Sequence, residues 1–335
     1  MGMKIAVIGA GSWGTALAQV LAGNGHEVCL WAYEPELVAG MQATRVNHLF
    51  LPGVALHPAL RFTNDLSTAV AGCELVLLVT PTQVMRGILG QLAPALGPDC
   101  LLVNASKGIE LETLSTVSQI VAQVLGEQAL QRYVALSGPT FAKEVAAGLP
   151  SLIVAGSRSQ AAAQTVQTAF SNNVFRVYSS DDPVGVELGG AVKNVIAIAA
   201  GIADGLGFGH NTRAALITRG LAEMRRLGRA LGAQDGTFAG LAGMGDLVLT
   251  CTGDLSRNRT VGIKLGQGQK LADIMAEMRM VAEGVKSAAS VNALAARLGV
   301  EMPITTKVYE ILHCDKPARQ AVLELMSRDL KAEQA

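Results

Sequence analysis

The feature that most constrains this chain is a strand, a glycine-rich turn and a helix in direct succession near its N-terminus. The apolar run 4–8 (KIAVI) has the composition of a buried parallel strand. It leads into Gly9-Ala10-Gly11-Ser12-Trp13-Gly14, and residues 15–22 then form an apolar segment that ends at Gly23. A G-x-G-x-x-G sequence between a strand and a helix is typical of a dinucleotide-binding turn. A glycine-rich turn without a ligand is the alternative that the motif alone leaves open.

The three motif glycines have separate predicted roles. We expect Gly9 to permit the tight turn, Gly11 to let the backbone approach a pyrophosphate, and Gly14 to allow close helix–strand packing. The pyrophosphate would lie on the free N–H groups at the N-terminus of the helix. A second strand is predicted over 27–31. Glu34 lies 20 residues beyond Gly14, where a carboxylate can accept hydrogen bonds from the ribose hydroxyls of NAD.

Length, charge and cysteine usage limit the classes of protein to which the chain can belong. A chain of 335 residues exceeds a usual single domain, so we expect two. Lys plus Arg and Asp plus Glu both total 27, which excludes a strong overall field for nucleic acid or an anionic membrane. The five cysteines are scattered without a C-x-x-C pair, so we predict no metal site and a reducing, cytoplasmic location. The apolar stretch 184–203 contains Glu187, Lys193 and Asn194, and we therefore predict no integral membrane segment.

Strands and helices are predicted to alternate along the first half of the chain. Short loops between alternating elements indicate right-handed crossovers and a mostly parallel sheet. Ligands bind beyond the carboxyl ends of such strands. Strands are expected over 75–79, 100–103, 152–154 and 174–178, helices over 65–71, 84–92 and 160–170, and a polar irregular region over 35–58. The loops that this arrangement places on one rim are Thr80-Pro81, Ser106-Lys107 and Ser137-Gly138-Pro139-Thr140.

The pattern changes at Asp182-Pro183. Asp182 is a predicted helix N-cap with Pro183 at the first helical position. Helical periodicity continues from there, including a helix over 212–231 that we expect Asn211 to cap. We therefore predict an α/β protein with a Rossmann-like, mostly parallel domain over 1–182 and an all-helical domain over 183–335.

Three polar features of the second half have both a structural and a functional interpretation. Lys193 interrupts an apolar helix, and it either extends to the surface or acts as a general acid/base in a cleft. Asp246, in a glycine-rich turn, either caps the following helix or belongs to a site. The donor cluster 256–260 (SRNRT) is either a solvated loop or a phosphate-binding group, because Arg257 can hold a phosphate through two parallel hydrogen bonds.

With these residues assembled, the chain resembles the bacterial-type NAD(P)-dependent glycerol-3-phosphate dehydrogenases nearly from end to end. The glycine-rich motif is shared by many dehydrogenases, whereas the middle motifs together are specific to this family. The resemblance rests on the segments 9–17 (GAGSWGTAL), 106–110 (SKGIE), 137–144 (SGPTFAKE), 188–195 (LGGAVKNV), 243–247 (GMGDL), 256–259 (SRNR) and 281–284 (VAEG).

The resemblance implies reversible reduction of dihydroxyacetone phosphate to sn-glycerol 3-phosphate by hydride transfer from NAD(P)H, which supplies glycerophospholipid synthesis. Lys193 matches the position of the proton donor and acceptor. The positions that match contacts to the three-carbon phosphate are Lys107, Gly138, Thr140, Lys193, Asp246, Ser256, Arg257 and Asn258. The positions that match contacts to the dinucleotide are Ser12, Trp13, Lys107, Ala142, Arg257, Val281 and Glu283, in addition to Gly9, Gly11 and Gly14.

The chain departs from the family beside the adenosine ribose. Where the family often carries His or Arg, this chain has Ala32-Tyr33-Glu34. An arginine would favour the 2′-phosphate of NADP, whereas the carboxylate of Glu34 would repel it, and Tyr33 can still stack on the adenine. The preference between NADH and NADPH stays open, and we expect use of both.

Two other functions also stay open. A related β-hydroxyacid or ketopantoate-type reductase would share the sheet and a helical domain with a lysine, but would prefer a carboxylate substrate. A non-catalytic dinucleotide-binding sensor would bind NAD(P)H without turnover. For partners, we expect a small-molecule substrate and no nucleic acid, and the apolar helical domain is compatible with a homodimer.

Overall fold

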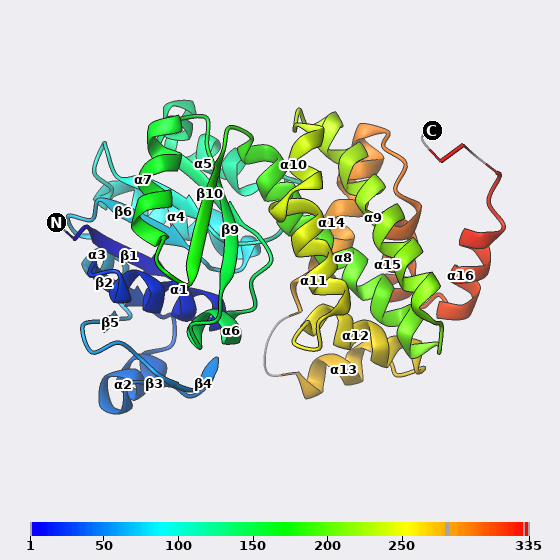
Figure 1. Ribbon diagram of the computed structural model, residues 1–335, viewed down its shortest axis with the longest axis horizontal. Coiled ribbons are helices and arrows are strands. Elements are labelled where there is room, and N and C mark those ends of the chain that lie inside the picture. The colour runs from blue at the N-terminus through cyan, green and yellow to red at the C-terminus, as the bar shows by residue number, and fades with distance from the viewer. Residues whose placement is uncertain (1, 279–281, 331, 334–335) are drawn as a thin grey trace.

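The computed structural model describes residues 2–278, 282–330 and 332–333. The first half of the chain forms a part with a large sheet, and the second half forms a helical part beside it (Figure 1). Strand β10 (Phe175–Ser180) is followed directly by helix α8 (Pro183–Gly205), whose N-cap is Asp182 as predicted. The predicted order, an α/β part followed by helices, is confirmed.

One eight-stranded sheet organises the first part. Its strand order is β10-β9-β8-β7-β6-β1-β2-β5, and neighbouring strands are parallel except for the antiparallel pair β8–β9. The prediction of a mostly parallel sheet is therefore confirmed. The strands are β1 Lys4–Ile8, β2 Glu27–Trp31, β5 Arg61–Thr63, β6 Leu75–Leu78, β7 Leu101–Asn104, β8 Tyr133–Ser137, β9 Ser151–Gly156 and β10, and a separate hairpin is formed by β3 Val46–Asn47 and β4 Leu51–Ala55.

Helices cover both faces of the sheet, because alternate residues of each strand point to opposite sides. Ile5 and Val7 of β1 belong to the cluster under α1, whereas Ala6 and Ile8 belong to the cluster on the other face. The helices of this part are α1 Ser12–Gly23, α2 Pro35–Thr44, α3 Leu66–Val70, α4 Met85–Leu92, α5 Val117–Leu125, α6 Ala142–Ala146 and α7 Gln160–Phe170, with 3₁₀ turns over Thr82–Val84, Ala93–Ala95 and Glu127–Arg132.

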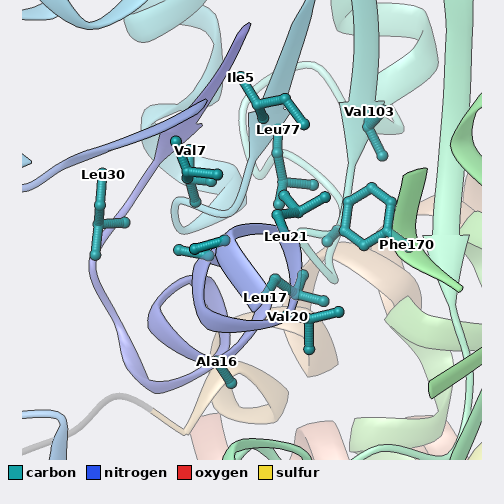
Figure 2. Close-up of a cluster of buried hydrophobic side chains, with 14 of the residues drawn as sticks. Ile5, Val7, Ala16, Leu17, Val20, Leu21, Leu30, Leu77, Val103 and Phe170 are labelled. Carbon is teal, nitrogen blue, oxygen red and sulfur yellow. The ribbon is translucent and has the colours of Figure 1, made fainter. Parts of the chain in front are cut away.

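The helix that follows the glycine-rich turn is packed tightly on the sheet. Figure 2 shows Leu17 and Leu21 of α1 among the strand residues Ile5, Val7 and Leu77. All five side chains are fully buried. Burying a Leu, Ile or Val side chain stabilises a fold by about 1.5–3 kcal/mol, so this cluster holds the N-terminus of α1 at the end of β1.

Helix α8 is the central helix of the second part. Its residues 185–203 are buried, and α9, α11, α12 and α14 pack around it. By length and composition alone α8 could cross a membrane, yet here it is a fully covered core helix. The helices of this part are α8, α9 His210–Ala230, α10 Asp235–Ala239, the π-helical turn η4 Leu241–Gly245, α11 Asp246–Thr252, α12 Arg257–Gly266, α13 Leu271–Glu277, α14 Glu283–Leu298, α15 Pro303–His313 and α16 Ala318–Met326.

Glycines allow α8 and α12 to approach each other backbone to backbone. A Cβ atom on Gly201 would lie 2.1 Å from the Arg259 carbonyl oxygen, and one on Gly262 would lie 2.2 Å from the Ile198 carbonyl oxygen. Both distances are far shorter than any real contact of a Cβ atom. This crossing fixes the start of α12 relative to α8.

The region 35–58 is not irregular, contrary to the sequence-based expectation. Helix α2 begins with Pro35 at its first position and buries Val38 and Met41, and the hairpin β3–β4 follows it. Pro at the first helical position is a recognised start signal. The polar average of the region conceals the two buried apolar positions, which lie three residues apart on one helix face.

Helix boundaries in the second part also differ from the expectation. Helix α9 begins at His210 after Gly209, so Asn211 lies in its first turn and is not its N-cap. The last helix, α16, ends at Met326. Helix α10 and η4 were not anticipated, because their sequence is short and rich in glycine.

We predict that Gly201→Ala lowers the free energy of unfolding by about 1–3 kcal/mol, because the added methyl group forces α8 and α12 apart. Gly87→Ala in α4 is the matched control, since a Cβ atom there meets no described heavy atom within 4 Å. That control should raise the free energy of unfolding by about 0.4–1 kcal/mol. Urea unfolding measures both values, and equal effects of the two substitutions would contradict the proposed crossing.

Candidate active site

The rim formed by the carboxyl ends of β6, β7 and β8 lies against the helical part. The loop after β8 carries Pro139, and a Cβ atom on Gly245 would lie 3.5 Å from its ring. Phe141, further along the same loop, packs against Gly253, where a Cβ atom would lie 2.5 Å from the ring. The loop that follows β8 therefore faces α11 and the turn before it, as the sequence predicts for a ligand-binding rim.

One buried carboxylate joins the two parts of the molecule. Asp246, the first residue of α11, has no solvent exposure, and its Oδ2 accepts a hydrogen bond from Lys107 Nζ at 2.8 Å. Its Oδ1 accepts from Lys193 Nζ of α8. Lys193 Nζ also donates to Thr250 Oγ1 at 2.9 Å. Asp246 is thus bound to two ammonium groups.

This geometry decides two of the alternatives that the sequence left open. The Lys193 side chain is only 7% exposed, so it does not extend to the surface. Asp246 is not an N-cap, because Gly245 holds that position and the Asp246 carboxylate accepts from the two lysines. Both residues belong to a buried ionic cluster in the contact between sheet rim and helices.

Burial and neighbouring charge lower the pKa of Lys193 to about 7. Desolvation of the ammonium group is the largest cause, and the positive charge of Lys107 acts in the same direction. The carboxylate of Asp246 opposes the decrease. A lysine with such a pKa can both donate and accept a proton near neutral pH, which is the requirement for a general acid/base.

A second acid lies close to the same cations. Burial raises the pKa of the Glu283 carboxyl at the start of α14, and the positive charges of Arg257, Lys107 and Lys193 oppose the rise. Arg257, Lys107 and Lys193 therefore all contribute positive charge near the Glu283 carboxyl group. Cations gathered at a partly desolvated site favour an anionic ligand.

The donor cluster at 256–260 is not a solvated loop. Ser256 caps α12 by accepting a hydrogen bond from the Arg259 N–H at 3.2 Å, and Arg257 is the first residue of that helix. Asn258 is buried, with its Nδ2 donating to Asn194 Oδ1 at 2.9 Å and its Oδ1 accepting from the Gly284 N–H at 3.0 Å. Asn258 therefore fixes α12 between α8 and α14, beside Arg257.

Gly138 and Thr140 lie on the rim loop after β8. A Cβ atom on Gly138 would lie 2.9 Å from the Ile153 Cα atom, so only glycine fits against β9. Thr140 Oγ1 donates to the Gly138 carbonyl oxygen at 3.2 Å and is partly exposed. The loop is thus held in a fixed shape with the Thr140 hydroxyl near the surface of the rim.

The glycine-rich turn has the geometry that a pyrophosphate site requires. Gly9 has φ = +120°, and a Cβ atom there would lie 2.6 Å from the Val79 carbonyl oxygen. A Cβ atom on Gly14 would lie 1.9 Å from the Gly9 carbonyl oxygen. Around Gly11, the N-cap of α1, the described residues leave open space, so a ligand can approach the backbone there.

The other predicted dinucleotide contacts have varied surroundings. Ser12 Oγ donates to the Phe50 carbonyl oxygen at 2.5 Å, and Trp13 is partly buried beside it. Tyr33 is 79% exposed at the end of β2, and Ala142 is the partly exposed first residue of α6. Val281 lies outside the described residues.

Several buried polar atoms on and near the rim have no hydrogen-bond partner within the part of the chain that the structure describes. They include Trp13 Nε1, Thr80 Oγ1, Thr82 Oγ1 and Ser137 Oγ. An unpaired buried polar group costs about 1–3 kcal/mol, so these atoms favour a polar ligand along the carboxyl ends of β1, β6 and β8. Together with the open backbone at Gly11 they fit a dinucleotide such as NAD(P)H.

Sequence reasoning missed two polar residues of the cluster. Thr250 binds Lys193, and it also donates to the Asp246 carbonyl oxygen at 2.6 Å. Its spacing of four from Asp246 on one helix face is the signal that could have indicated it. Asn194 was noticed only as an interruption of the apolar helix, although it bonds Asn258.

No cluster of three or more His, Cys, Asp or Glu side chains with metal-binding geometry occurs among the residues described. The acids of the site are instead surrounded by lysine and arginine side chains.

Comparison with known proteins gives matches over nearly the whole chain. Two family models match the chain: the NAD-dependent glycerol-3-phosphate dehydrogenase N-terminus over residues 4–163 and the corresponding C-terminus over residues 182–323. A relative from Trichlorobacter lovleyi, named glycerol-3-phosphate dehydrogenase [NAD(P)+], is 79% identical over 99% of this chain and 100% of its own length. A relative of the same name from Geobacter sulfurreducens is 66% identical over 99% of both chains.

A solved structure shows the same fold. The crystal structure of glycerol-3-phosphate dehydrogenase from Coxiella burnetii superposes with a TM-score of 0.93 at 41% identity, and the match covers 98% of this chain and 99% of that one. Both family models and the full-length relatives therefore agree on one family. The chain belongs to the NAD-dependent glycerol-3-phosphate dehydrogenase family.

Proposed function

We propose that this protein reduces dihydroxyacetone phosphate to sn-glycerol 3-phosphate with NAD(P)H, and that Lys193 is the general acid/base. The observation that carries the proposal is the buried cluster in which Asp246 holds Lys193 and Lys107 beside the rim of the dinucleotide-binding sheet. The names of the full-length relatives support the same reaction. A bound reduced nicotinamide supplies the hydride for the ketone carbon of the substrate.

Lys193 acts at the oxygen of the same carbonyl group. As the hydride arrives, negative charge develops on that oxygen, and the Lys193 ammonium stabilises the charge and then donates a proton to it. The lowered pKa of Lys193 makes the loss of the proton favourable near neutral pH. Asp246 holds the ammonium group in place, and Lys107 contributes a second positive charge from the opposite side of the carboxylate.

The phosphate of the substrate is assigned to the start of α12 and the rim. Arg257 has the planar, two-pronged donor geometry that suits a phosphate. Ser256, Asn258, Gly138 and Thr140 stand at the substrate positions implied by the family resemblance. Because the Asn258 side chain is already bound to Asn194 and Gly284, we propose that it shapes the phosphate site and holds α12 in position.

The cofactor is assigned to the glycine-rich turn and the adjacent rim. Gly9, Gly11 and Gly14 would hold the pyrophosphate, with Ser12, Trp13, Ala142 and Glu283 beside them. Lys107 and Arg257 are proposed to contact both cofactor and substrate. Tyr33 would lie at the adenosine end, where its exposure leaves a face free for stacking.

The domain organisation, location and assembly are proposals as well. The end of β10 at Ser180 and the N-cap of α8 at Asp182 support a dinucleotide-binding domain over 1–182 and a helical domain over 183–335. The five free thiols support a cytoplasmic location, where the product supplies glycerophospholipid synthesis. A homodimer is supported by the apolar face of α16, where Leu323 and Met326 are 70% and 80% exposed.

The proposed reaction is tested by the loss of reduced-nicotinamide absorbance when purified protein is mixed with dihydroxyacetone phosphate. We expect rapid oxidation of both NADH and NADPH, with the ratio set by Tyr33 and Glu34 beside the ribose. A panel of 2-keto acids, including ketopantoate, should be inert. Oxidation of NAD(P)H with these acids would instead indicate a ketopantoate-type reductase, which would prefer them. Normal NADH binding with no oxidation by any substrate would instead indicate a dinucleotide sensor.

We predict that Lys193→Met lowers kcat by about 10²–10⁴-fold, the typical contribution of general acid catalysis. The Kd for NADH should stay unchanged, because the glycine-rich turn is intact. Lys264→Met is the matched control, since Lys264 is a helical lysine of the same part that pairs with Glu277 away from the site. Turnover of Lys193→Met close to that of the control would contradict the assignment.

A further inference from the structure

Glu187 is a buried acid that takes no part in the proposed chemistry. It lies on α8, six residues before Lys193, and only 8% of its surface is exposed. One oxygen, Oε1, accepts from the Ser118 N–H at 2.9 Å and from the Tyr133 hydroxyl at 2.5 Å. The other, Oε2, accepts from the Ser118 hydroxyl at 2.5 Å. The carboxylate therefore ties α8 to α5 and β8 of the sheet.

A further bond of this carboxylate leads towards the catalytic cluster. Asn104, the last residue of β7, donates from Nδ2 to Glu187 Oε1 at 3.5 Å and to the Ser106 carbonyl oxygen at 3.4 Å. Asn104 Oδ1 accepts from the Ser106 N–H at 3.0 Å. The Ser106 hydroxyl in turn donates to the Thr80 carbonyl oxygen at 2.6 Å. Asn104 thus fixes Ser106 at the beginning of the loop after β7, and Lys107 is the next residue of that loop.

The Lys107 side chain then crosses α8 through a gap left by a glycine. A Cβ atom on Gly190 would lie 3.2 Å from Lys107 Cγ and 2.8 Å from Ser137 Oγ. Positions 187, 190 and 194 lie on one face of a helix, because they are separated by three and four residues. One face of α8 therefore carries the Glu187 anchor and the gap for Lys107, beside Lys193.

We propose that Glu187 is a positioning residue for the reduction: through Asn104 it fixes the Lys107 loop against α8, so that Lys107 and Lys193 both reach Asp246. This inference rests on the proposed function, because it assigns Glu187 to the orientation of that site. Hydrogen bonds join Glu187 to Asn104 and Asn104 to Ser106. Lys107 follows Ser106 in the chain and is bonded to Asp246, so the path from Glu187 to Asp246 is continuous.

Glu223 provides a comparison within the same chain. It is also buried, on α9, and it accepts from the N–H groups of Ile304 and Thr305 at the start of α15. Burial raises the pKa of both Glu187 and Glu223, so desolvation disfavours the charged form of both acids. Glu223 holds a helix end, and its hydrogen bonds to described residues go to Ile304 and Thr305, whereas Glu187 is bonded to the residue that shapes the Lys107 loop.

The test compares Asn104→Ala and Glu187→Gln with Glu223→Gln as the matched control. Asn104→Ala breaks the path while leaving Glu187 with its Ser118 and Tyr133 bonds, so it remains informative even if Glu187→Gln fails to fold. We expect both site variants to lose up to about 100-fold in kcat/KM for dihydroxyacetone phosphate, the cost of a small misplacement of a catalytic group. For Glu223→Gln, both the Kd for NADH and the kinetics should remain unchanged.

Two further readouts separate positioning from general destabilisation. Lys107 lowers the pKa of Lys193, while Asp246 raises it. Glu283 and Cys251 also lie close enough to Lys193 to interact with its charge. If Lys107 is released, its charge no longer lowers the pKa of Lys193. The alkaline limb of the pH profile of kcat/KM should then move to higher pH in both site variants. Lys107, which is 13% exposed, should also react faster with acetic anhydride, as read by peptide mass spectrometry.

The outcomes distinguish this inference from the proposed function. Faster labelling of Lys107 in both site variants, with no change in Glu223→Gln, supports the positioning role whatever the substrate is. Unchanged labelling and an unchanged pH limb in the site variants would overturn it. A wild-type protein that does not oxidise NADH with dihydroxyacetone phosphate would overturn the proposed function instead.

Discussion

The structure depends on a single buried carboxylate that binds two ammonium groups. Asp246 has no solvent exposure, and a charge in that position is stable only when it is paired and hydrogen-bonded. Lys107 reaches it from the sheet rim and Lys193 from the central helix. Because the two lysines come from different parts of the molecule, the cluster is complete only when sheet and helices are packed in this arrangement. The same burial lowers the pKa of Lys193 into the range where proton transfer is useful.

The rest of the fold supplies the positions from which these three side chains act. Parallel strands place Lys107 at a rim, and the turn at Gly9, Gly11 and Gly14 lies at the same edge, where we propose that the dinucleotide binds. Close glycine contacts hold α12 against α8, so that Asn258, the residue after Arg257, reaches Asn194, the residue after Lys193. The proposed substrate and cofactor sites therefore share one border, which is what direct transfer between two bound molecules requires.

The sequence predicts the fold well where the signal is local. The succession of strand, glycine turn and helix, and the Asp182-Pro183 helix start, are each encoded within a few residues. The cluster itself is not local: Asp246 is 139 positions from Lys107 and 53 from Lys193, so spacing alone left cap and site equally open. Similarly, no local pattern indicates that β9 runs antiparallel to β8, or that Asn258 is bound by Asn194. The family resemblance indicated that Lys107, Lys193 and Asp246 belong to one site, and the structure shows their contacts; hydrophobic periodicity indicates neither.

The measurement that tests the central claim most directly is the pH dependence of kcat/KM for reduction, from about pH 5 to about pH 9, in the wild type and in Asp246→Asn. Reduction needs Lys193 as an ammonium group, so the rate should fall as the pH rises above the pKa of about 7. Asp246 favours the charged form, and its neutralisation should move this limb to lower pH. A wild-type profile that stays flat to the alkaline end, or an identical midpoint in both proteins, would contradict the account.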